Sequence, residues 1–511
     1  MKRPAQVLRQ TKTAVTQRIS TLAGQSERNV LLCTVLIATA VSAVIGLFLT
    51  QYFAIDAVSS LVFVPDDCYL DWGVKVGRHC FSDYSMPLSF GMRPNPWEPY
   101  PVPTPAGVTY GYNNYAAAGM LPLMIFGVLG KALAAPQLAL VGYTVVLSIA
   151  VLTPALWAAR GAVGLERIVV FIACGVAAIP AWMVIDRGNS TGFVVPVALV
   201  FLVALCRQRW GVVAVMVILA ALVKPQFAVL GVVLFAARQW RWAGIAVVGG
   251  VVSNVAAYAL WPRDFPQTIP QSLHNIFGYG SFQALVVNFN VSFGKALLLI
   301  PDGIKAQQAG GKVPDGFLAG PRSLIGYVIL GLVVVGLVVL GRRIPPVMAG
   351  IVLLAAASLS PPLSQPYYLV FALPIAALLA RDPHGPAGKG IFDRPETVAG
   401  RRRAVGVWIS LAAALSIAHI ALPSPSVQVG DITGHMGAGT ATRAVVVTTV
   451  SVAPILWLIA IGAILLSYTR RPAARDDDER SAPPGSTDAD TASSASGTPD
   501  PVPELSPQRG A

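Results

Sequence analysis

The 22-residue stretch from Asn29 to Thr50, NVLLCTVLIATAVSAVIGLFLT, contains no charged side chain. A helix needs about 20 predominantly apolar residues to cross the hydrocarbon core of a bilayer, so this stretch is long enough. It is longer than the core of a signal peptide, and no small-residue cleavage site follows it. Residues 1–28, which precede it, are basic and polar. We therefore predict a retained first transmembrane helix with its N-terminus in the cytoplasm.

The composition of the whole chain agrees with a membrane protein. Hydrophobic residues make up 55% of the 511 residues, charged residues only 12%, and the mean hydropathy is +0.64. Soluble domains carry about 25% charged residues, so the composition excludes an ordinary soluble enzyme, a disordered protein and a nucleic-acid binder. We predict an all-α, polytopic integral membrane protein. The five cysteines are too few for a disulfide scaffold and lack the spacing of a zinc site.

Eleven further apolar segments bring the predicted number of transmembrane helices to twelve. They lie near 136–158, 167–185, 193–206, 211–223, 225–237, 244–261, 323–341, 346–361, 367–380, 405–422 and 443–467. Several are shorter than a straight span requires, so we expect them to pair, tilt or lie in thinned membrane.

The segment 117–134 decides the sidedness of the loops. Counted as a span, it would place Arg207, Arg238 and Arg342 outside the cell; counted as an interfacial or re-entrant helix, it places them inside. Basic residues collect on the cytoplasmic side of membranes, which favours the second topology. That topology places 25 of the 37 Lys and Arg residues inside and both termini in the cytoplasm, in a plasma-membrane protein. The net charge of +13 then requires no nucleic-acid partner.

The topology divides the chain into seven regions. They are a cytoplasmic N-terminus (1–28), the first helix (29–50), an extracytoplasmic loop with juxtamembrane helices (51–135), a group of transmembrane helices (136–261), a large extracytoplasmic loop (262–322), a second group of transmembrane helices (323–467) and a cytoplasmic tail (468–511). The tail is rich in Pro, Ser, Thr and Asp, which is typical of disorder.

No acidic residue lies in the middle of a predicted span. Eleven of the 24 lie outside: Asp56, Asp66, Asp67, Asp71, Asp83, Glu98, Asp186, Asp264, Asp302, Asp315 and Asp431. Ion-coupled transporters usually keep ionisable groups near the midplane of the bilayer, so this distribution weakens a transport function. It favours chemistry at the outer face of the membrane.

The densest acidic group is Val64-Pro65-Asp66-Asp67-Cys68-Tyr69-Leu70-Asp71, shortly after the first helix. Two adjacent carboxylates at a surface of low dielectric repel each other and raise at least one pKa, which suits a general base. An alternative interpretation is that an Asp caps a short helix. Cys68 and Cys80 lie in the same loop and could form a disulfide in an oxidising compartment, or remain free thiols.

Two polar islands interrupt the later apolar segments. Arg187-Gly188-Asn189 lies at the outer end of one span, where it could hold a phosphate or hydroxyl, or form a hairpin turn. Lys224-Pro225-Gln226 divides an apolar run into two short helices. A lysine in such a place is costly unless it pairs with an anion, such as a lipid-linked phosphate, or extends to the interface.

The order of these motifs resembles that of the GT-C glycosyltransferases that use polyprenyl-phosphate sugars, in the actinobacterial mannosyltransferase and arabinofuranosyltransferase branch. The resemblance covers roughly residues 30–380 and rests on motif order as much as on any one motif. The matching segments are Asp66-Asp67-Cys68-Tyr69, the stretch Tyr110–Tyr115, Gly188-Asn189 (where the family has Gly-Gln), Leu222-Val223-Lys224-Pro225, Asn290-Val291-Ser292 and Ser364-Gln365-Pro366-Tyr367-Tyr368.

The resemblance implies an inverting transfer of a mannosyl or arabinofuranosyl residue to a glycan or glycolipid of the cell envelope. It assigns the base to Asp67 or Asp66, with Asp67 preferred, and the phosphate of the donor to Lys224, helped by Arg187 or Asn189. The candidate substrate contacts are Tyr69, Asp71, His274, Tyr367 and Tyr368. Membrane lipids, the donor and the acceptor are the expected partners, and no metal or other cofactor is expected. The alternative functions are a flippase or transporter of lipid-linked sugars and a non-catalytic partner in envelope assembly.

Overall fold

The computed structural model describes residues 25–53, 81–104, 107–278, 290–308, 320–393, 403–423, 427–434, 437–443 and 446–469. All of them belong to one unit of the chain, Met1–Arg471. The tail that was predicted to be disordered lies outside the described residues, apart from its first two.

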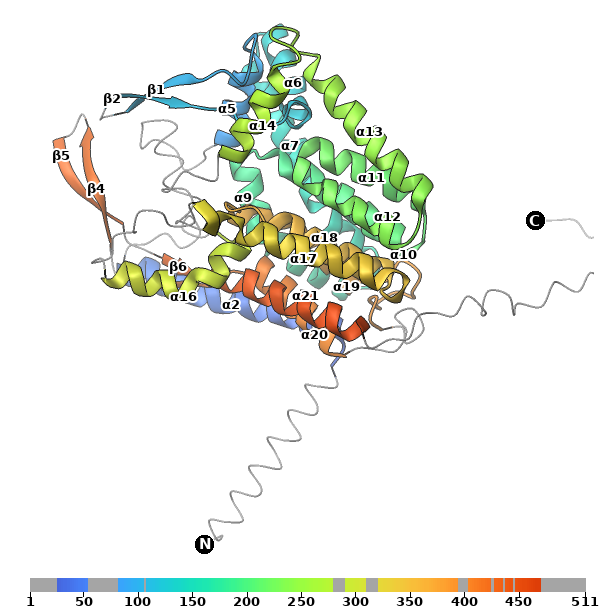
Figure 1. Cartoon of the computed structure of the whole chain (residues 1–511). Coiled ribbons are helices and arrows are strands. Elements are labelled where there is room, and N and C mark those ends of the chain that lie inside the picture. Colours follow the sequence, from blue (N-terminus) through green and yellow to red (C-terminus); the bar gives the residue numbers. More distant parts are fainter. Residues whose placement is uncertain are drawn as a thin grey trace, which may run out of the picture. The chain divides into compact units, whose positions relative to one another are not determined.

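Helices make up most of the described chain, as the composition predicted (Figure 1). The helices of the first half are α2 (Glu27–Phe53), α5 (Ser82–Gly91), α6 (Ala117–Ala132), α7 (Pro136–Ala159), α8 (Leu165–Phe171), η1 (Ile172–Val176), α9 (Ile179–Arg187), η2 (Ser190–Phe193), α10 (Val194–Cys206), α11 (Trp210–Val223), η3 (Pro225–Gly231), α12 (Val232–Ala236) and α13 (Trp240–Tyr258). Those that follow are α14 (Thr268–Gly278), α16 (Phe293–Gln308), η5 (Gly320–Leu324), α17 (Ile325–Leu340), η6 (Gly341–Arg343), α18 (Pro346–Leu359), η7 (Pro366–Phe371), α19 (Ala372–Ala380), α20 (Arg403–Ile417), η8 (Thr449–Val452) and α21 (Ala453–Thr469).

Among the residues that the structure describes, three small antiparallel strand pairs accompany the helices, and the all-α prediction did not include them. They are β1 (Tyr100–Thr104) with β2 (Gly107–Gly111), β3 (Ala421–Pro423) with β6 (Val446–Thr448), and β4 (Val427–Gly434) with β5 (Gly437–Arg443). β1 contains two prolines, Pro101 and Pro103. Polyproline II and β conformations lie close together in φ and ψ, and a two-stranded sheet consists of edge strands only, which tolerate Pro.

Among the described residues, four helical segments are long and apolar enough to cross a membrane: Glu27–Tyr52, Pro136–Ala159, Pro321–Arg343 and Thr449–Thr469. A fifth is formed if α8–η1 and α9, which meet at a 50° bend, count as one span. Seven shorter apolar helices accompany them. This is the architecture of a membrane-embedded helical protein, although length and composition alone account for fewer than the twelve predicted spans.

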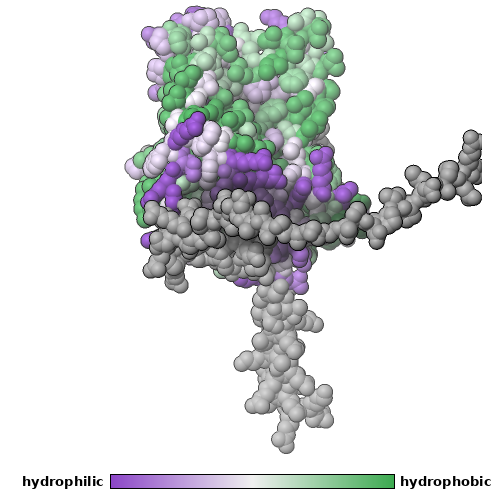
Figure 2. Space-filling model, turned by 90° about the vertical axis from the view of Figure 1, so that its right-hand side faces the viewer, coloured by the Kyte–Doolittle hydropathy of each residue, from purple (hydrophilic) through white to green (hydrophobic). Residues whose placement is uncertain are grey.

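The outer surfaces of these helices are apolar, as contact with lipid requires. Leu47 on α2, Ile149 on α7 and Val339 on α17 are 72%, 60% and 76% exposed. Exposing so many large apolar side chains to water would be unfavourable, whereas a bilayer solvates them. Figure 2 shows one face of the molecule, on which hydrophilic residues gather in a band below a hydrophobic surface.

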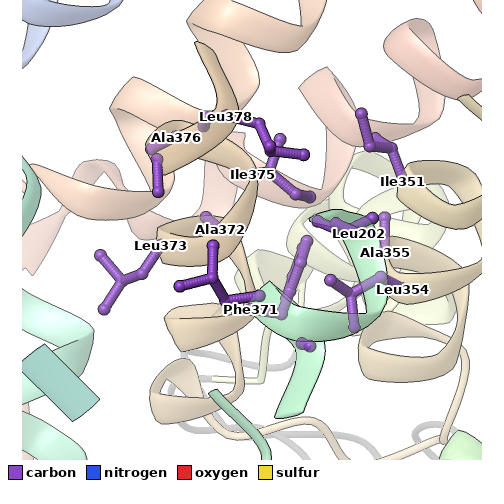
Figure 3. Close-up of a cluster of buried hydrophobic side chains, with 14 of the residues drawn as sticks. Leu202, Ile351, Leu354, Ala355, Phe371, Ala372, Leu373, Ile375, Ala376 and Leu378 are labelled. Carbon is purple, nitrogen blue, oxygen red and sulfur yellow. The ribbon is translucent and has the colours of Figure 1, made fainter. Parts of the chain in front are cut away.

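The core lies where α10, α18 and α19 pack against one another. Every residue of α18 from Val347 to Leu359 is buried, and so is every residue of α19. Figure 3 shows Leu202 of α10 among side chains of α18 and α19, including Ile351, Leu354 and Ile375. A helix that is buried on all sides fixes its neighbours, so the segments that precede α19 and follow α18 are held in defined positions.

Candidate functional site

Asp83 stands in the first turn of α5, a short helix that lies against the end of α9. The backbone N–H of Phe81 donates to the carbonyl of Asp186 at 3.0 Å, which joins the start of α5 to the end of α9 across about 100 residues of sequence. Tyr84 packs against the ring of Tyr143 at 4.7 Å between centroids. These contacts direct the carboxylate of Asp83 toward the residues that follow α9.

Three hydrogen bonds hold the carboxylate of Asp83. Arg187 donates from Nε to Oδ2 at 2.6 Å and from Nη2 to Oδ1 at 3.2 Å, and Asn189 donates from Nδ2 to Oδ2 at 2.8 Å. The side chain of Arg187 is 8% exposed and that of Asp83 is 17% exposed. A fork of two guanidinium bonds fixes both the position and the plane of the carboxylate.

The turn after α9 positions Arg187 and Asn189 on the same carboxylate. Gly188, between them, has a φ of +66°, a conformation that a residue with a Cβ rarely adopts. Its carbonyl accepts a hydrogen bond from the hydroxyl of Tyr143 at 2.8 Å. Asn189 then caps η2, because its Oδ1 accepts from the N–H of Thr191 at 2.8 Å while its Nδ2 binds Asp83. Both ends of the Asn189 amide are therefore used.

Three tyrosines surround this group. The guanidinium of Arg187 lies 5.4 Å from the ring centroid of Tyr367, and the ammonium of Lys224 lies 4.1 Å from that of Tyr115. Tyr368 stacks beside Tyr367 at 4.9 Å. Aromatic faces attract cations, most strongly where water is excluded. We call Asp83, Arg187, Asn189, Lys224, Tyr115, Tyr367 and Tyr368 the Asp83 cluster.

Lys224 enters the cluster because the helix α11 ends before it. The residue before a proline is disfavoured in the α conformation, and Lys224 is extended, with φ −142° and ψ 112°. Pro225 then opens η3, and Nε2 of Gln226 donates to the carbonyl of Ala357 at 3.0 Å. The predicted break between two short helices is confirmed.

The charges of the cluster do not cancel. Arg187 is neutralised by Asp83, whereas the ammonium of Lys224 forms no ion pair or hydrogen bond with any described residue. Burial alone raises the pKa of Asp83, but the charge and hydrogen bonds of Arg187, the hydrogen bond of Asn189 and the charge of Lys224 bring that pKa below its ordinary value of 3.8. An ionised carboxylate and two cations leave one positive charge, which suits an anionic ligand.

A second pair of motifs meets beside the cluster. The N–H of Val291 donates to the carbonyl of Ser364 at 2.8 Å, and the N–H of Ser364 donates to Oδ1 of Asn290 at 3.0 Å. Nδ2 of Asn290 donates to the carbonyl of Pro362 at 2.7 Å. Asn290 is 6% exposed, so its amide is structural in this fold, although Asn290-Val291-Ser292 matches a glycosylation sequon. These bonds fix the loop that leads to Tyr367.

The structure brings together five of the residues selected from the sequence: Arg187, Asn189, Lys224, Tyr367 and Tyr368. His274 is not among them, because it lies on the exposed side of α14. The other selected residues, Asp66, Asp67, Cys68, Tyr69, Asp71 and Cys80, lie outside the described residues. The base and the disulfide that were predicted there stay predictions.

Sequence analysis missed Asp83 and Tyr115. Asp83 is followed directly by Tyr84 in the same loop, so the pattern of an acidic residue near a tyrosine could have selected it. Its partners lie 104 and 106 positions later in the chain, and no local pattern encodes a pairing at that distance.

Comparison with known proteins adds no assignment to this geometry: no protein-family model matches the chain, and no curated protein matches it. Within the described part of the chain, no three His, Cys, Asp or Glu side chains come together as a metal site would require.

Proposed function

We propose that the chain is a membrane glycosyltransferase, which moves a mannosyl or arabinofuranosyl residue from a polyprenyl-phosphate donor to a glycan or glycolipid acceptor. The observation that carries this proposal is the Asp83 cluster. It combines a partly buried, ionised carboxylate with a lysine that forms no ion pair within the described residues, at the ends of membrane helices. A polyprenyl-phosphate sugar presents the complementary groups, a phosphate anion and an anomeric carbon, on a lipid tail.

The sidedness of the proposed reaction follows from the basic residues. With the N-terminus and the turns at Arg207, Arg238 and Arg342 inside, the Asp83 cluster faces the outside of the plasma membrane. There a lipid-linked donor needs no cytosolic nucleotide sugar. In this arrangement the twelve apolar segments all take part in the membrane domain, the short ones as pairs broken at Pro225 and Pro366.

The proposed reaction is a single displacement. The hydroxyl oxygen of the acceptor forms a bond to the anomeric carbon of the donor while the bond from that carbon to the phosphate oxygen breaks, which inverts the configuration. The proton of the hydroxyl passes to the carboxylate of Asp83. Lys224 stabilises the charge on the departing polyprenyl phosphate, and Arg187 lies within reach of the same anion.

The low pKa of Asp83 sets the timing of the proton transfer. A carboxylate with a low pKa is always ionised near neutral pH, but it is a weak base for an unactivated hydroxyl. The hydroxyl becomes acidic only as its oxygen bonds to the anomeric carbon, so the proton moves late. Asp66 and Asp67 remain alternative bases, which asparagine variants distinguish from Asp83.

The experiment uses the purified chain in liposomes with radiolabelled polyprenyl-phosphate mannose or arabinofuranose and an acceptor glycolipid. We expect Asp83→Asn to lower the transfer rate by about 10²–10⁴-fold, the usual contribution of a positioned base. Glu98→Gln is the matched control, because Glu98 is a half-exposed carboxylate that pairs with Arg263 at 3.5 Å, outside the cluster. It should retain the wild-type rate.

The outcomes distinguish the candidate functions. Covalent transfer that is lost in Asp83→Asn supports the proposal, while loss in Asp67→Asn or Asp66→Asn and not in Asp83→Asn moves the base to that pair. Movement of the donor between leaflets without transfer would indicate a flippase. Absence of both activities with either sugar would leave a non-catalytic role in envelope assembly and refute the proposal.

A further inference from the structure

Tyr115, whose ring lies beneath Lys224, is held by its backbone on both sides. Its N–H donates to Oδ1 of Asn113 at 3.0 Å, and its carbonyl accepts from Nε1 of Trp97 at 2.9 Å. Trp97 and Asn113 are each 0% exposed. Hydrogen bonds of this kind are costly to break in a buried place, because the freed groups cannot turn to water. The position of Tyr115 is therefore fixed by Asn113, two residues earlier, and by Trp97, which lies in a different segment.

Asn275 of α14 joins the two partners of Tyr115. Its Nδ2 donates to the carbonyl of Trp97 at 3.1 Å and to the carbonyl of Asn113 at 3.2 Å. An amide nitrogen has two hydrogens, so both bonds can form at once. Asn275 is 7% exposed and lies next to the exposed His274. One side chain thus connects both residues that hold Tyr115.

The helix α14 is itself fixed against the end of α13. The hydroxyl of Tyr258 donates a hydrogen bond to Oγ of Ser272 at 2.8 Å. The ring of Trp97 packs against those of Tyr258 and Trp261, at 5.0 and 5.6 Å between centroids. Asn275 can therefore resist displacement of the two carbonyls that it binds.

The opposite side of Tyr115 leads directly to Lys224. Gly119 of α6 lies so close to the end of α11 that a Cβ there would be 2.7 Å from the carbonyl oxygen of Val223. Because Tyr115 precedes α6 and Lys224 follows Val223, this close approach places the aromatic ring under the ammonium. The resulting sequence of contacts runs from Asn275 through Trp97 and Asn113 to Tyr115 and then to Lys224.

We propose that Asn275 is a positioning residue for Lys224, acting through the backbone of Tyr115. It touches neither the proposed donor nor the proposed acceptor, and it fixes the ring that holds the ammonium where an anionic ligand would bind. The part of this proposal that concerns donor binding rests on the proposed function. The placement of Lys224 by Asn275 can be tested without any transfer activity.

The first test measures the exposure of the Lys224 ammonium by chemical modification. The purified full chain is treated with methyl acetimidate, and mass spectrometry compares the modification of Lys224 with that of Lys131 in the same sample. Asn275→Asp keeps the size of the side chain but removes both donors. We expect it to raise the relative modification of Lys224 by about three- to tenfold, the equilibrium worth of a lost cation–π contact. Leu273→Ala, on the exposed side of α14, should leave it unchanged.

A second variant keeps this test decisive if Asn275→Asp does not fold. Trp97→Phe preserves most of the aromatic packing but removes the Nε1 donor to Tyr115, so it should raise the modification of Lys224 in the same direction. The proposal is overturned if a variant retains its thermal transition and gel-filtration volume and its Lys224 is modified to the same extent as in the wild type.

The second test asks whether Asn275 acts through Tyr115. In the transfer assay, Asn275→Asp should raise the KM for the donor by about tenfold and change kcat by less than about threefold. In a Tyr115→Leu background, where the ring is already absent, the same substitution should add little to either KM or Lys224 modification. Full additivity would refute the pathway. Altered Lys224 modification in a chain that transfers no sugar would refute the proposed function and leave the role of Asn275 intact.

Discussion

Arg187 binds both carboxylate oxygens of Asp83, although the two residues are 104 positions apart in the chain. The pairing joins the loop after the first membrane helix to the end of α9. Asn189, two residues after Arg187, donates a further hydrogen bond to the same carboxylate. Removing one partner of a buried ion pair destabilises a fold more than replacing both partners by apolar residues, because the remaining charge is left without compensation. The pair therefore links the stability of the fold to the chemistry proposed for it.

Two substitutions of Arg187 distinguish the contribution of its positive charge from that of its two-bond geometry. Arg187→Lys keeps the positive charge but cannot form the fork, so we expect transfer to fall by about 10–10²-fold, and Arg187→Gln, without the charge, to fall further. Initial transfer rates at saturating donor measure the effect. Arg93→Lys, a matched change in a residue that stacks on Phe90 and Tyr100 outside the cluster, should have little effect. If Arg187→Lys transfers sugar at the wild-type rate, the two hydrogen bonds from the guanidinium to Asp83 are not required for transfer.

Replacing Lys224 tests the binding of the anion. Lys224→Gln should raise the KM for the donor by at least about tenfold, because a charge-assisted contact to the phosphate is lost, and Lys224→Arg should retain part of the affinity. The same assay with Lys131→Gln, which removes an exposed lysine of α6, provides the reference. The prediction fails if both glutamine variants have the same KM.

Acid should weaken the contribution of Asp83 to stability. Because its folded pKa lies below the ordinary value of 3.8, the ion pair stabilises the fold at every pH above the unfolded pKa, and this stabilisation is lost as the pH falls through the folded pKa. The difference in thermal midpoint between wild type and Asp83→Asn in detergent should therefore be constant from about pH 5 to 8 and shrink below about pH 4. A difference that changes near pH 6 would mean that another group is responsible.

Two glycines of α17 offer a matched test of the packing that holds the cluster. A Cβ at Gly326 would lie 1.9 Å from the carbonyl oxygen of Ser360, whereas one at Gly331 would meet nothing within 4 Å. Gly326→Ala should lower the free energy of unfolding by about 1–3 kcal/mol, as overpacking does. Gly331→Ala should be neutral or stabilising, because Ala is the better helix former. Thermal unfolding of the two variants in one detergent compares them, and equal midpoints would contradict the close approach of the two segments.

Hydropathy was sufficient to predict that the chain forms long apolar helices, and proline was sufficient to predict the break between two of the shorter ones. α7 begins at Pro136 and ends within one residue of the expected segment, and the chain leaves the helix at Lys224 because Pro225 follows. Both predictions depend on local physics: the length of an apolar run and the conformation allowed before a proline. The hairpins were missed because strand pairing depends on a partner segment and not on the strand alone.

The site was predicted in part for the same reason. Arg187, Asn189 and Lys224 were found because polar residues in apolar segments are conspicuous. Asp83 lies in a polar loop among other acidic residues, where nothing local distinguishes it. Its pairing with Arg187 depends on the folded chain, and the place of Tyr115 beneath Lys224 depends likewise on the contact of α6 with the end of α11.

The early end of α11 also determines how a ligand can approach. The helix has 14 residues, and at 1.5 Å per residue it rises about 21 Å, less than the roughly 30 Å thickness of the hydrocarbon core. If α11 starts at one boundary of that core, Lys224 lies several ångströms below the other. An amphiphile could then reach the ammonium by moving sideways within its own leaflet, with its tail still solvated by lipid. A water-soluble anion would have to descend from the aqueous phase, so at that depth the lysine would favour the membrane-dissolved donor that we propose.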